Sequence, residues 1–232
     1  MSAVPISAPA GAGGRFITFE GGEGVGKSTQ LRRLAERLQA AGVAVTVTRE
    51  PGGSPRAEQL RAFLLSGKAK RYGTSAETAL IAAGRADHVD RLIRPALKRG
   101  DWVLCDRFID STRCYQGVLG QAPERLIAGL ERLAARDVMP DLTLILDAPA
   151  SVGLGRARRR AGLDAAADRF ESEDESFHQR LREAFIEIAR HEPERCLLID
   201  ALGDADAVAA RIWDGVVRRW PELATQTKEA AR

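Results

Sequence analysis

Five short runs of mostly apolar residues are spaced along the chain, and helical patterns fill the intervals between them. The runs do not alternate strictly between apolar and polar residues, which is typical of strands covered on both faces in a parallel sheet. The alternation of strand and helix predicts an α/β fold with a doubly wound, parallel five-stranded sheet flanked by helices. The predicted strands cover residues 15–20, 43–49, 102–106, 142–147 and 196–200.

The helices are predicted from apolar residues that recur at intervals of three and four positions. The first helix stops at Gly42, since glycine readily adopts the left-handed backbone conformation that often follows a helix. Within the helix predicted over residues 75–99, Pro95 should bend or interrupt the helix because it lacks an amide hydrogen. The predicted helices cover residues 28–41, 75–99, 123–136, 151–160, 175–191 and 204–219.

The composition is typical of a globular protein, with 44% hydrophobic and 29% charged residues among 232. We expect one domain over residues 15–220, a disordered leader over residues 1–14 and a flexible tail over residues 221–232. No apolar run approaches the roughly 18 residues of a membrane span, so no membrane partner is expected. The leader lacks the features of a secretory signal, and the three cysteines have no metal-ligand spacing. Both features favour a reducing, cytoplasmic setting.

The net charge of +3 and the isoelectric point near 9.0 raise the question of a nucleic-acid partner. The Lys and Arg residues are spread along the predicted helices and are largely matched by acids. We therefore expect a mixed-charge surface and no nucleic-acid partner.

Residues 21–28, GGEGVGKS, follow the first predicted strand, open a helix and fit the pattern G-x-x-x-x-G-K-[ST]. In this phosphate loop, glycines let the backbone amides wrap a phosphate chain at the positive end of the helix. Lys27 is expected to hold the β- and γ-phosphates of ATP, and the Ser28 hydroxyl to bind Mg²⁺. The alternative is a glycine-rich turn that only caps the helix. The predicted ATP-binding residues are Gly21, Gly22, Glu23, Gly24, Val25, Gly26, Lys27, Ser28 and Thr29.

The third predicted strand ends in Asp106 and Arg107, at the edge of the sheet where ligands of such folds bind. Asp106 is predicted to help hold Mg²⁺, and Arg107 to contact a phosphoryl group. An Asp-Arg pair without function at the surface is the alternative. The sequence has no guanine-type N-K-x-D segment, which weakens the hypothesis of a GTPase.

A basic run, Arg156, Arg158, Arg159 and Arg160, follows the fourth predicted strand. Phosphoryl transfer depends on positioning and charge stabilisation, so a kinase should place several arginines around the transferred group. Glycines beside the run permit movement, and we predict a lid over about residues 151–171 that closes over ATP. A solvated basic helix and an RNA-binding patch are the alternatives.

Together these segments resemble the thymidylate kinase family over residues 15 to about 213. FEGGEGVGKST is similar to the family's F-E-G-x-[DE]-G-x-G-K-[ST]-T, in which the acid is unusual among phosphate loops. TREPGGS, after the second predicted strand, resembles T-R-E-P-G-G-[ST], and DRF at residues 106–108 resembles D-R-[YFH]. Residues 111–117 resemble S-[TS]-x-x-Y-Q-G, and DRFE at residues 168–171 resembles D-R-[FI]-E.

The resemblance implies a nucleoside monophosphate kinase that transfers the γ-phosphoryl group of ATP to dTMP with Mg²⁺. The products, dTDP and ADP, would place it in dTTP synthesis, and the family's usual assembly implies a homodimer. Arg107 is implied to hold the dTMP phosphate, and Glu23 to approach the sugar 3′-hydroxyl and the metal. Tyr115 is implied to exclude a ribose 2′-hydroxyl. The other implied substrate contacts are Arg49, Pro51, Ile81, Arg85, Thr112 and Gln116.

Two positions depart from a simple match to the family. Ile81 stands four residues before Arg85, where the family usually has a Phe that stacks on thymine, so an aliphatic contact is expected there. Arg156, Arg158 and Arg160 match the alternating catalytic arginines of family lids, whereas Arg159 is an extra cation without an assigned role. For Arg49, pairing with a nearby acid is the alternative to a place in the substrate pocket.

Two other functions stay open at this point. One is a kinase for another nucleotide or a deoxynucleoside, in which Arg85, Tyr115 and the TREPGG segment would have no special role. The other is an ATPase stimulated by nucleic acid through the basic run, which predicts ATP hydrolysis without a phosphorylated nucleotide product. The absence of a second basic face in the sequence disfavours the ATPase.

Overall fold

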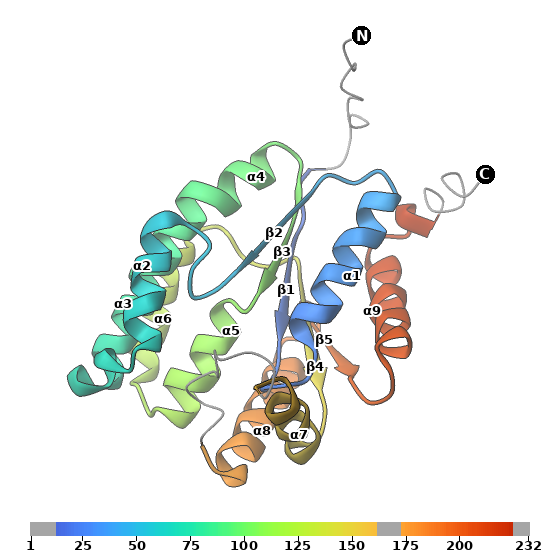
Figure 1. Cartoon of the computed structure of the whole chain (residues 1–232). Coiled ribbons are helices and arrows are strands. Elements are labelled where there is room, and N and C mark those ends of the chain that lie inside the picture. Colours follow the sequence, from blue (N-terminus) through green and yellow to red (C-terminus); the bar gives the residue numbers. More distant parts are fainter. Residues whose placement is uncertain (1–12, 162–172, 225–232) are drawn as a thin grey trace.

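A computed structural model describes residues 13–161 and 173–224, without the side chains of residues 158, 160 and 161. Five parallel strands form one sheet in the order β2-β3-β1-β4-β5, which confirms the predicted fold class (Figure 1). Every residue of β1 is buried, whereas β2 and β5 at the edges carry exposed residues. The strands are β1 (Phe16–Glu20), β2 (Val45–Arg49), β3 (Trp102–Asp106), β4 (Leu142–Asp147) and β5 (Cys196–Asp200).

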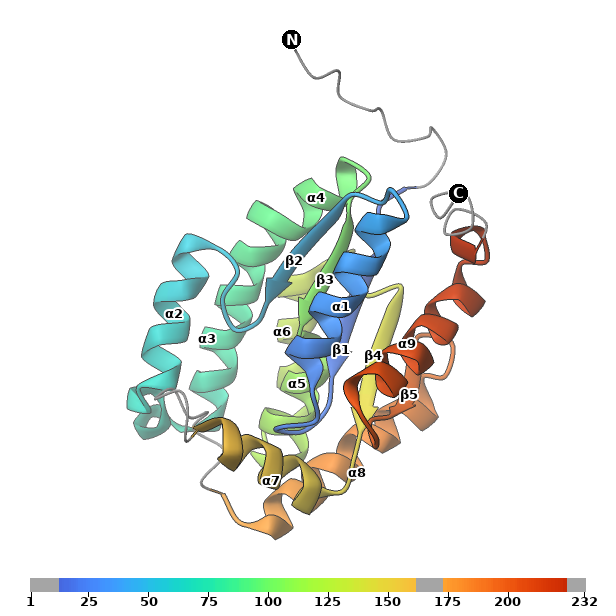
Figure 2. The same ribbon diagram turned by 45° about the vertical axis from the view of Figure 1, so that its right-hand side comes forward.

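Helices cover both faces of the sheet (Figures 1 and 2). On one face, α1 and α9 pack on the strands through a core that includes Leu31, Leu144 and Ile212. On the other face, apolar residues of α4, α6 and α8 complete two further clusters. The helices are α1 (Lys27–Ala40), α2 (Pro55–Leu65), α3 (Gly73–His88), α4 (Arg94–Lys98), α5 (Ile109–Thr112), α6 (Glu124–Ala135), α7 (Ala150–Ala161), α8 (Glu175–His191) and α9 (Ala205–Arg219).

The helix predicted over residues 75–99 is divided in the structure. It consists of α3, a π-helical turn over Val89–Ile93, and α4. Pro95 lies in the first turn of α4, directly after the π-helical turn, so the hydrogen-bond pattern of the helix changes next to the residue that lacks an amide hydrogen. The interruption predicted from Pro95 is therefore confirmed, and the π-helical turn lets the chain continue in a helical path.

Three helical regions were not predicted from the sequence: α2, the 3₁₀-helical turn Lys68–Tyr72, and α5 with the turn that follows it. Helix α2 begins with a Ser54 cap that accepts a hydrogen bond from the Ala57 amide at 3.4 Å. Only Ala57 and Leu64 of this helix are buried, so its apolar stripe is too sparse to reveal a helical period. Helix α5 and the π-helical turn Arg113–Leu119, called η3, carry polar residues toward the sheet edge, which also hides their period.

Some predictions lie outside the described residues. These are the leader up to residue 12, the part of the lid over residues 162–171 with its DRFE segment, and the tail from residue 225. Among the helices that the structure describes, none combines the length and the apolar character needed to cross a membrane.

The core of the central strands should dominate stability. Leu144 of β4 is fully buried, so Leu144→Ala should lower the free energy of unfolding by about 2–5 kcal/mol. Leu198 of β5 is 42% exposed, and the same substitution there should cost about 1 kcal/mol or less. Urea denaturation of both variants measures the difference, and equal losses would contradict this account of the core.

Candidate functional site

The phosphate loop joins β1 to α1 and encloses its own lysine. Gly24 has a φ of 67°, which glycine adopts without steric cost, and a side chain there would collide with the carbonyl of Gly153 in α7. Lys27 is buried, and its Nζ donates to the carbonyl oxygens of Gly21 and Gly22 at 3.0 and 2.6 Å. The loop thus has the closed shape of an anion site, with a cation at its centre.

Ser28 and Asp106 meet beside the loop, as the predicted magnesium site requires. Ser28 Oγ donates to Asp106 Oδ2 at 2.5 Å. A hydroxyl and a carboxylate are hard oxygen ligands of the kind that Mg²⁺ takes in addition to waters and substrate phosphates. In the described part of the chain, no three His, Cys, Asp or Glu residues form a metal cluster. The donor set therefore fits an ion that is held largely by phosphates and water.

A cavity of about 490 Å³ extends from the phosphate loop past the ends of β2 and β3 to α2, α3 and η3. This volume is within the range of small-molecule sites. It brings most of the predicted site residues together, although they come from separate parts of the chain. The predicted residues on its wall are Glu23, Gly24, Gly26, Lys27, Ser28, Thr29, Arg49, Pro51, Ile81, Arg85, Asp106, Arg107, Thr112, Tyr115 and Gln116.

Three predicted residues of the phosphate loop do not line this cavity. Gly21, Gly22 and Val25 line a second cavity, of about 20 Å³, on the side of α7 and α8. Glu23 reaches both cavities. The smaller one has room for about one water molecule, so the larger cavity is the site for a ligand.

The carboxylate of Glu23 is the electrostatic centre of the larger cavity. Its Oε1 accepts hydrogen bonds from Arg107 Nη2 and from the Tyr115 hydroxyl, both at 2.6 Å. Burial opposes its ionisation, but the charges of Arg107 and Lys27 and the hydrogen bond from Tyr115 outweigh burial and hold the pKa of Glu23 at about 2. Glu23 is therefore ionised at neutral pH, and it fixes two of the predicted substrate contacts.

Arg85 is held from several directions in a nearly closed setting. Its Nε donates to Glu50 Oε2 at 2.7 Å, and its Nη2 donates to the Phe108 carbonyl and to Thr112 Oγ1, both at 3.0 Å. Glu50 also lies 3.0 Å from His88 Nδ1. Because both partners of this ion pair are buried, Glu50 holds the guanidinium in one orientation at the cavity wall.

Two further predicted contacts have acidic partners. Gln116 Nε2 donates to the buried Glu77 at 3.0 Å, which orients the amide beside the cavity. Arg49 donates to Glu58 at 3.1 Å, so the acid pairing left open for this residue is present in the structure. The Arg49 side chain is 53% exposed and also lines the cavity. Its pairing and its access to a ligand are thus compatible.

The predicted lid begins with α7, along the sheet edge that holds the phosphate loop (Figure 2). Arg156 donates to the carbonyl oxygens of Ala201 and Gly203 at 3.2 and 3.3 Å, in the loop between β5 and α9. Arg159 is exposed and donates to Gly155 of its own helix. The side chains of Arg158 and Arg160 lie outside the described residues.

Sequence reasoning missed several acids and one hydroxyl that hold the predicted residues. Glu50 and Glu77 orient Arg85 and Gln116, and Ser111 accepts a hydrogen bond from Arg107 at 3.1 Å. Glu50 and Ser111 stand inside segments already noted as motifs, which was a usable signal. Glu77 carries no such signal, because an acid in a helix is ordinarily exposed.

Comparison with known proteins places this geometry in a family. A family model described as thymidylate kinase matches residues 19–212. The thymidylate kinase of Nitrobacter winogradskyi is 60% identical over 200 residues, covering 86% of each chain. That of Caulobacter vibrioides is 58% identical over 206 residues, covering 89% of this chain and 97% of the relative.

A solved structure agrees with the sequence comparisons. The thymidylate kinase of Ehrlichia chaffeensis superimposes with a TM-score of 0.67 at 34% identity, covering 88% of this chain and 98% of that one. The residues matched by the family model include the phosphate loop and the residues that line the cavity. The chain belongs to the thymidylate kinase family.

Proposed function

We propose that this protein transfers the γ-phosphoryl group of ATP to dTMP, releasing dTDP and ADP. The observation that carries the proposal is one continuous cavity that extends from Lys27 of the phosphate loop to Arg85 and Gln116. A phosphate donor and a nucleotide acceptor can therefore meet in one enclosed space. The protein is a nucleoside monophosphate kinase on this proposal, and its product would enter dTTP synthesis.

The charges along the cavity suit a direct transfer between two phosphates. Lys27 would neutralise the β- and γ-phosphates, and Arg107 would hold the dTMP phosphate beside them. An oxygen of the dTMP phosphate attacks the γ-phosphorus, and a new P–O bond forms while the bond to the leaving ADP oxygen breaks. Because little covalent chemistry is asked of the protein, orientation by these two cations is its main contribution.

Ser28 and Asp106 would hold Mg²⁺, with Glu23 close to its ligand shell and to the sugar 3′-hydroxyl. When bound, the ion neutralises charge on the β- and γ-phosphates. The hydrogen bond between Ser28 and Asp106 supports this role, because it brings both ligand oxygens to one place.

The far end of the cavity is proposed to select the acceptor. Arg85 and Gln116 would bind the thymine ring with Thr112, while Ile81 packs on the ring in place of an aromatic residue. Tyr115 would block a ribose 2′-hydroxyl, and its own hydroxyl is already fixed by Glu23. Arg49 and Pro51 would line the monophosphate side of the pocket.

The lid is proposed to add cations to the transferred group through Arg156, Arg158 and Arg160. Arg156 contacts the carbonyls of Ala201 and Gly203, so it would exchange these partners as the lid closes. Arg159 keeps no assigned role. We also propose a cytoplasmic setting and no nucleic-acid partner.

Acceptor selectivity tests the proposal directly. ADP release with Mg²⁺ and ATP should be fastest with dTMP among a panel of dTMP, dUMP, ribosyl TMP, dCMP, dGMP and thymidine. A preference for another acceptor would keep the phosphate site and overturn the substrate assignment. ATP hydrolysis raised by DNA or RNA, without a phosphorylated nucleotide, would instead favour the ATPase.

Two variants separate the donor and acceptor ends of the site. Lys27→Ala should abolish transfer, because the β- and γ-phosphates lose their central cation. Arg107→Ala should raise the KM for dTMP about tenfold or more, as expected from the roughly 1.5–3 kcal/mol of a charged hydrogen bond, with a much smaller effect on ATP. Arg99→Ala, at an exposed pair with Asp101, serves as the control. Full activity in either test variant would disprove the role assigned to that residue.

We further propose a homodimer, in keeping with the family. Exposed apolar side chains on α6 and η3 support this proposal, since Leu133 is 68% and Val118 61% exposed. Light scattering should give twice the chain mass, and Leu133→Asp should shift the protein toward the monomer. Leu202→Asp, at a 42% exposed site between β5 and α9, should leave the assembly unchanged. A monomeric wild type would refute the dimer.

A further inference from the structure

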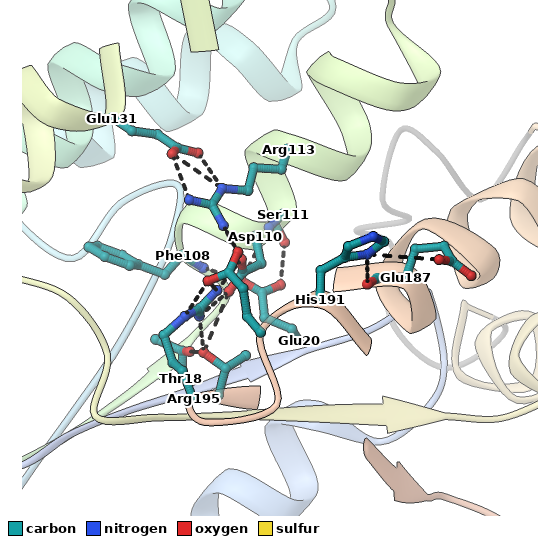
Figure 3. A network of polar contacts seen from close by, with 12 residues as sticks. Thr18, Glu20, Phe108, Asp110, Ser111, Arg113, Glu131, Glu187, His191 and Arg195 are labelled. Carbon is teal, nitrogen blue, oxygen red and sulfur yellow. Dashed lines mark hydrogen bonds and ion pairs between the residues drawn. The ribbon is translucent and has the colours of Figure 1, made fainter. Parts of the chain in front are cut away.

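Glu20 is a fully buried acid that the proposed reaction does not use. It is the last residue of β1, directly before the phosphate loop, and it is 0% exposed. A buried carboxylate is costly unless donors surround it. Among the described residues, its three hydrogen bonds come from one turn, the segment that follows β3 and carries Arg107 (Figure 3).

The backbone of this turn needs support. Arg107 has a φ of 70°, a left-handed backbone conformation that a residue with a side chain keeps only where its surroundings hold it. Its amide donates to the Phe19 carbonyl at 2.9 Å, so the turn begins on the sheet. The next amide, of Phe108, donates to Glu20 Oε1 at 2.7 Å, and the Ser111 amide donates to the same oxygen at 3.2 Å. Glu20 thus binds the chain directly after the strained residue, at Phe108 and again at Ser111.

A hydroxyl extends this support to the guanidinium of Arg107. Ser111 Oγ donates its single proton to Glu20 Oε2 at 2.7 Å. Its lone pairs are therefore directed elsewhere, and they accept a hydrogen bond from Arg107 Nη1 at 3.1 Å. The other end of the guanidinium, Nη2, donates to Glu23. Arg107 is consequently held between two acids, directly by Glu23 and through Ser111 by Glu20.

The surrounding network keeps α5 in place under this turn (Figure 3). Asp110 is fully buried and accepts from both Nη atoms of Arg195, at 2.7 and 2.9 Å. Arg113 donates to Asp110 at 3.3 Å and to Glu131 at 2.9 Å. This ion-pair network fixes the helix that presents Ser111, and it needs no contribution from Glu20.

The carboxylate of Glu20 opposes folding at neutral pH. Burial, and next the charge of Asp110, raise the pKa of Glu20 to about 7. The folded state therefore binds more protons than the unfolded state between the ordinary pKa of 4.5 and about 7, and stability falls as the pH rises through this range. A neutral amide at this position would remove that cost.

We propose that Glu20 is a positioning residue for Arg107, which it holds through the Phe108 amide and the Ser111 hydroxyl at the place where the acceptor phosphate binds. The inference rests on the proposed function, in which Arg107 contacts that phosphate. Glu20, which directly precedes the phosphate loop, would therefore affect the binding of the acceptor and not the binding of ATP.

The E20Q variant tests this role. The amide oxygen of Gln can still accept the hydrogen bond from the Phe108 amide. Its NH₂ group, however, donates to Ser111 Oγ where the carboxylate accepted. The hydroxyl proton of Ser111 then points toward Arg107 and repels the guanidinium. The KM for dTMP should rise about tenfold, the KM for ATP should stay within about twofold, and the urea midpoint at pH 8 should not fall. E131Q, which has no contact to Arg107 and keeps both hydrogen bonds from Arg195 to Asp110, should leave both KM values unchanged.

A second variant identifies the path through Ser111. S111A should also raise the KM for dTMP selectively, and E20Q combined with S111A should raise it by less than the product of the separate effects. An unchanged KM for dTMP in E20Q would overturn the proposal. Equal rises in both KM values together with a lower urea midpoint would show a purely structural role and would also overturn it.

Calorimetric titration with dTMP separates this inference from the proposed function. If the wild type binds dTMP without phosphorylating it, the proposed function fails, and the dissociation constants of wild type and E20Q still test Glu20. A tenfold weaker binding by E20Q would support the positioning role. If the wild type binds none of the monophosphates in the panel, both proposals are overturned.

Discussion

The parallel direction of all five strands is the constraint on which the site depends. Because β1, β2 and β3 end at the same edge, residues from distant parts of the sequence arrive side by side without long connections. The phosphate loop follows β1, the Glu50 turn follows β2, and Asp106 with Arg107 closes β3. A change of direction in any of these strands would carry its charged residue to the opposite end of the molecule.

Charge pairing and hydrogen bonds make this convergence of charged side chains tolerable where they are buried. Glu23 and Glu20 are three residues apart, yet their pKa values shift in opposite directions, to about 2 and about 7. Glu23 is surrounded by cations, whereas Glu20 is buried next to Asp110. At one end of the loop, Glu23 is ionised, faces the cavity and binds Arg107 directly. At the other end, the ionised form of Glu20 is disfavoured by burial, and Glu20 holds Arg107 through Ser111.

The sequence was sufficient to predict the strands and the positions of most cavity residues. A short apolar run such as residues 142–147, which lies between two helical patterns, indicates a buried strand. The spacing of the glycines, Lys27 and Ser28 indicates a phosphate-binding loop. The sequence was not sufficient for α2, whose buried stripe is sparse, or for Glu77, whose burial depends on tertiary contacts. Hydrogen bonds between residues far apart in the sequence, such as the one that joins Glu23 to Tyr115 across 92 positions, leave no local pattern.

The close contact between Gly24 and Gly153 has a consequence for how the phosphate loop and α7 would move. Because no side chain separates the two backbones, the start of α7 rests directly on the phosphate loop. The lid that we propose would therefore not move independently of the loop. The base of the lid and the loop would then shift together, so that phosphate binding in the loop would affect the angle of α7. A methyl group at either glycine would collide with the facing backbone and push the two segments apart.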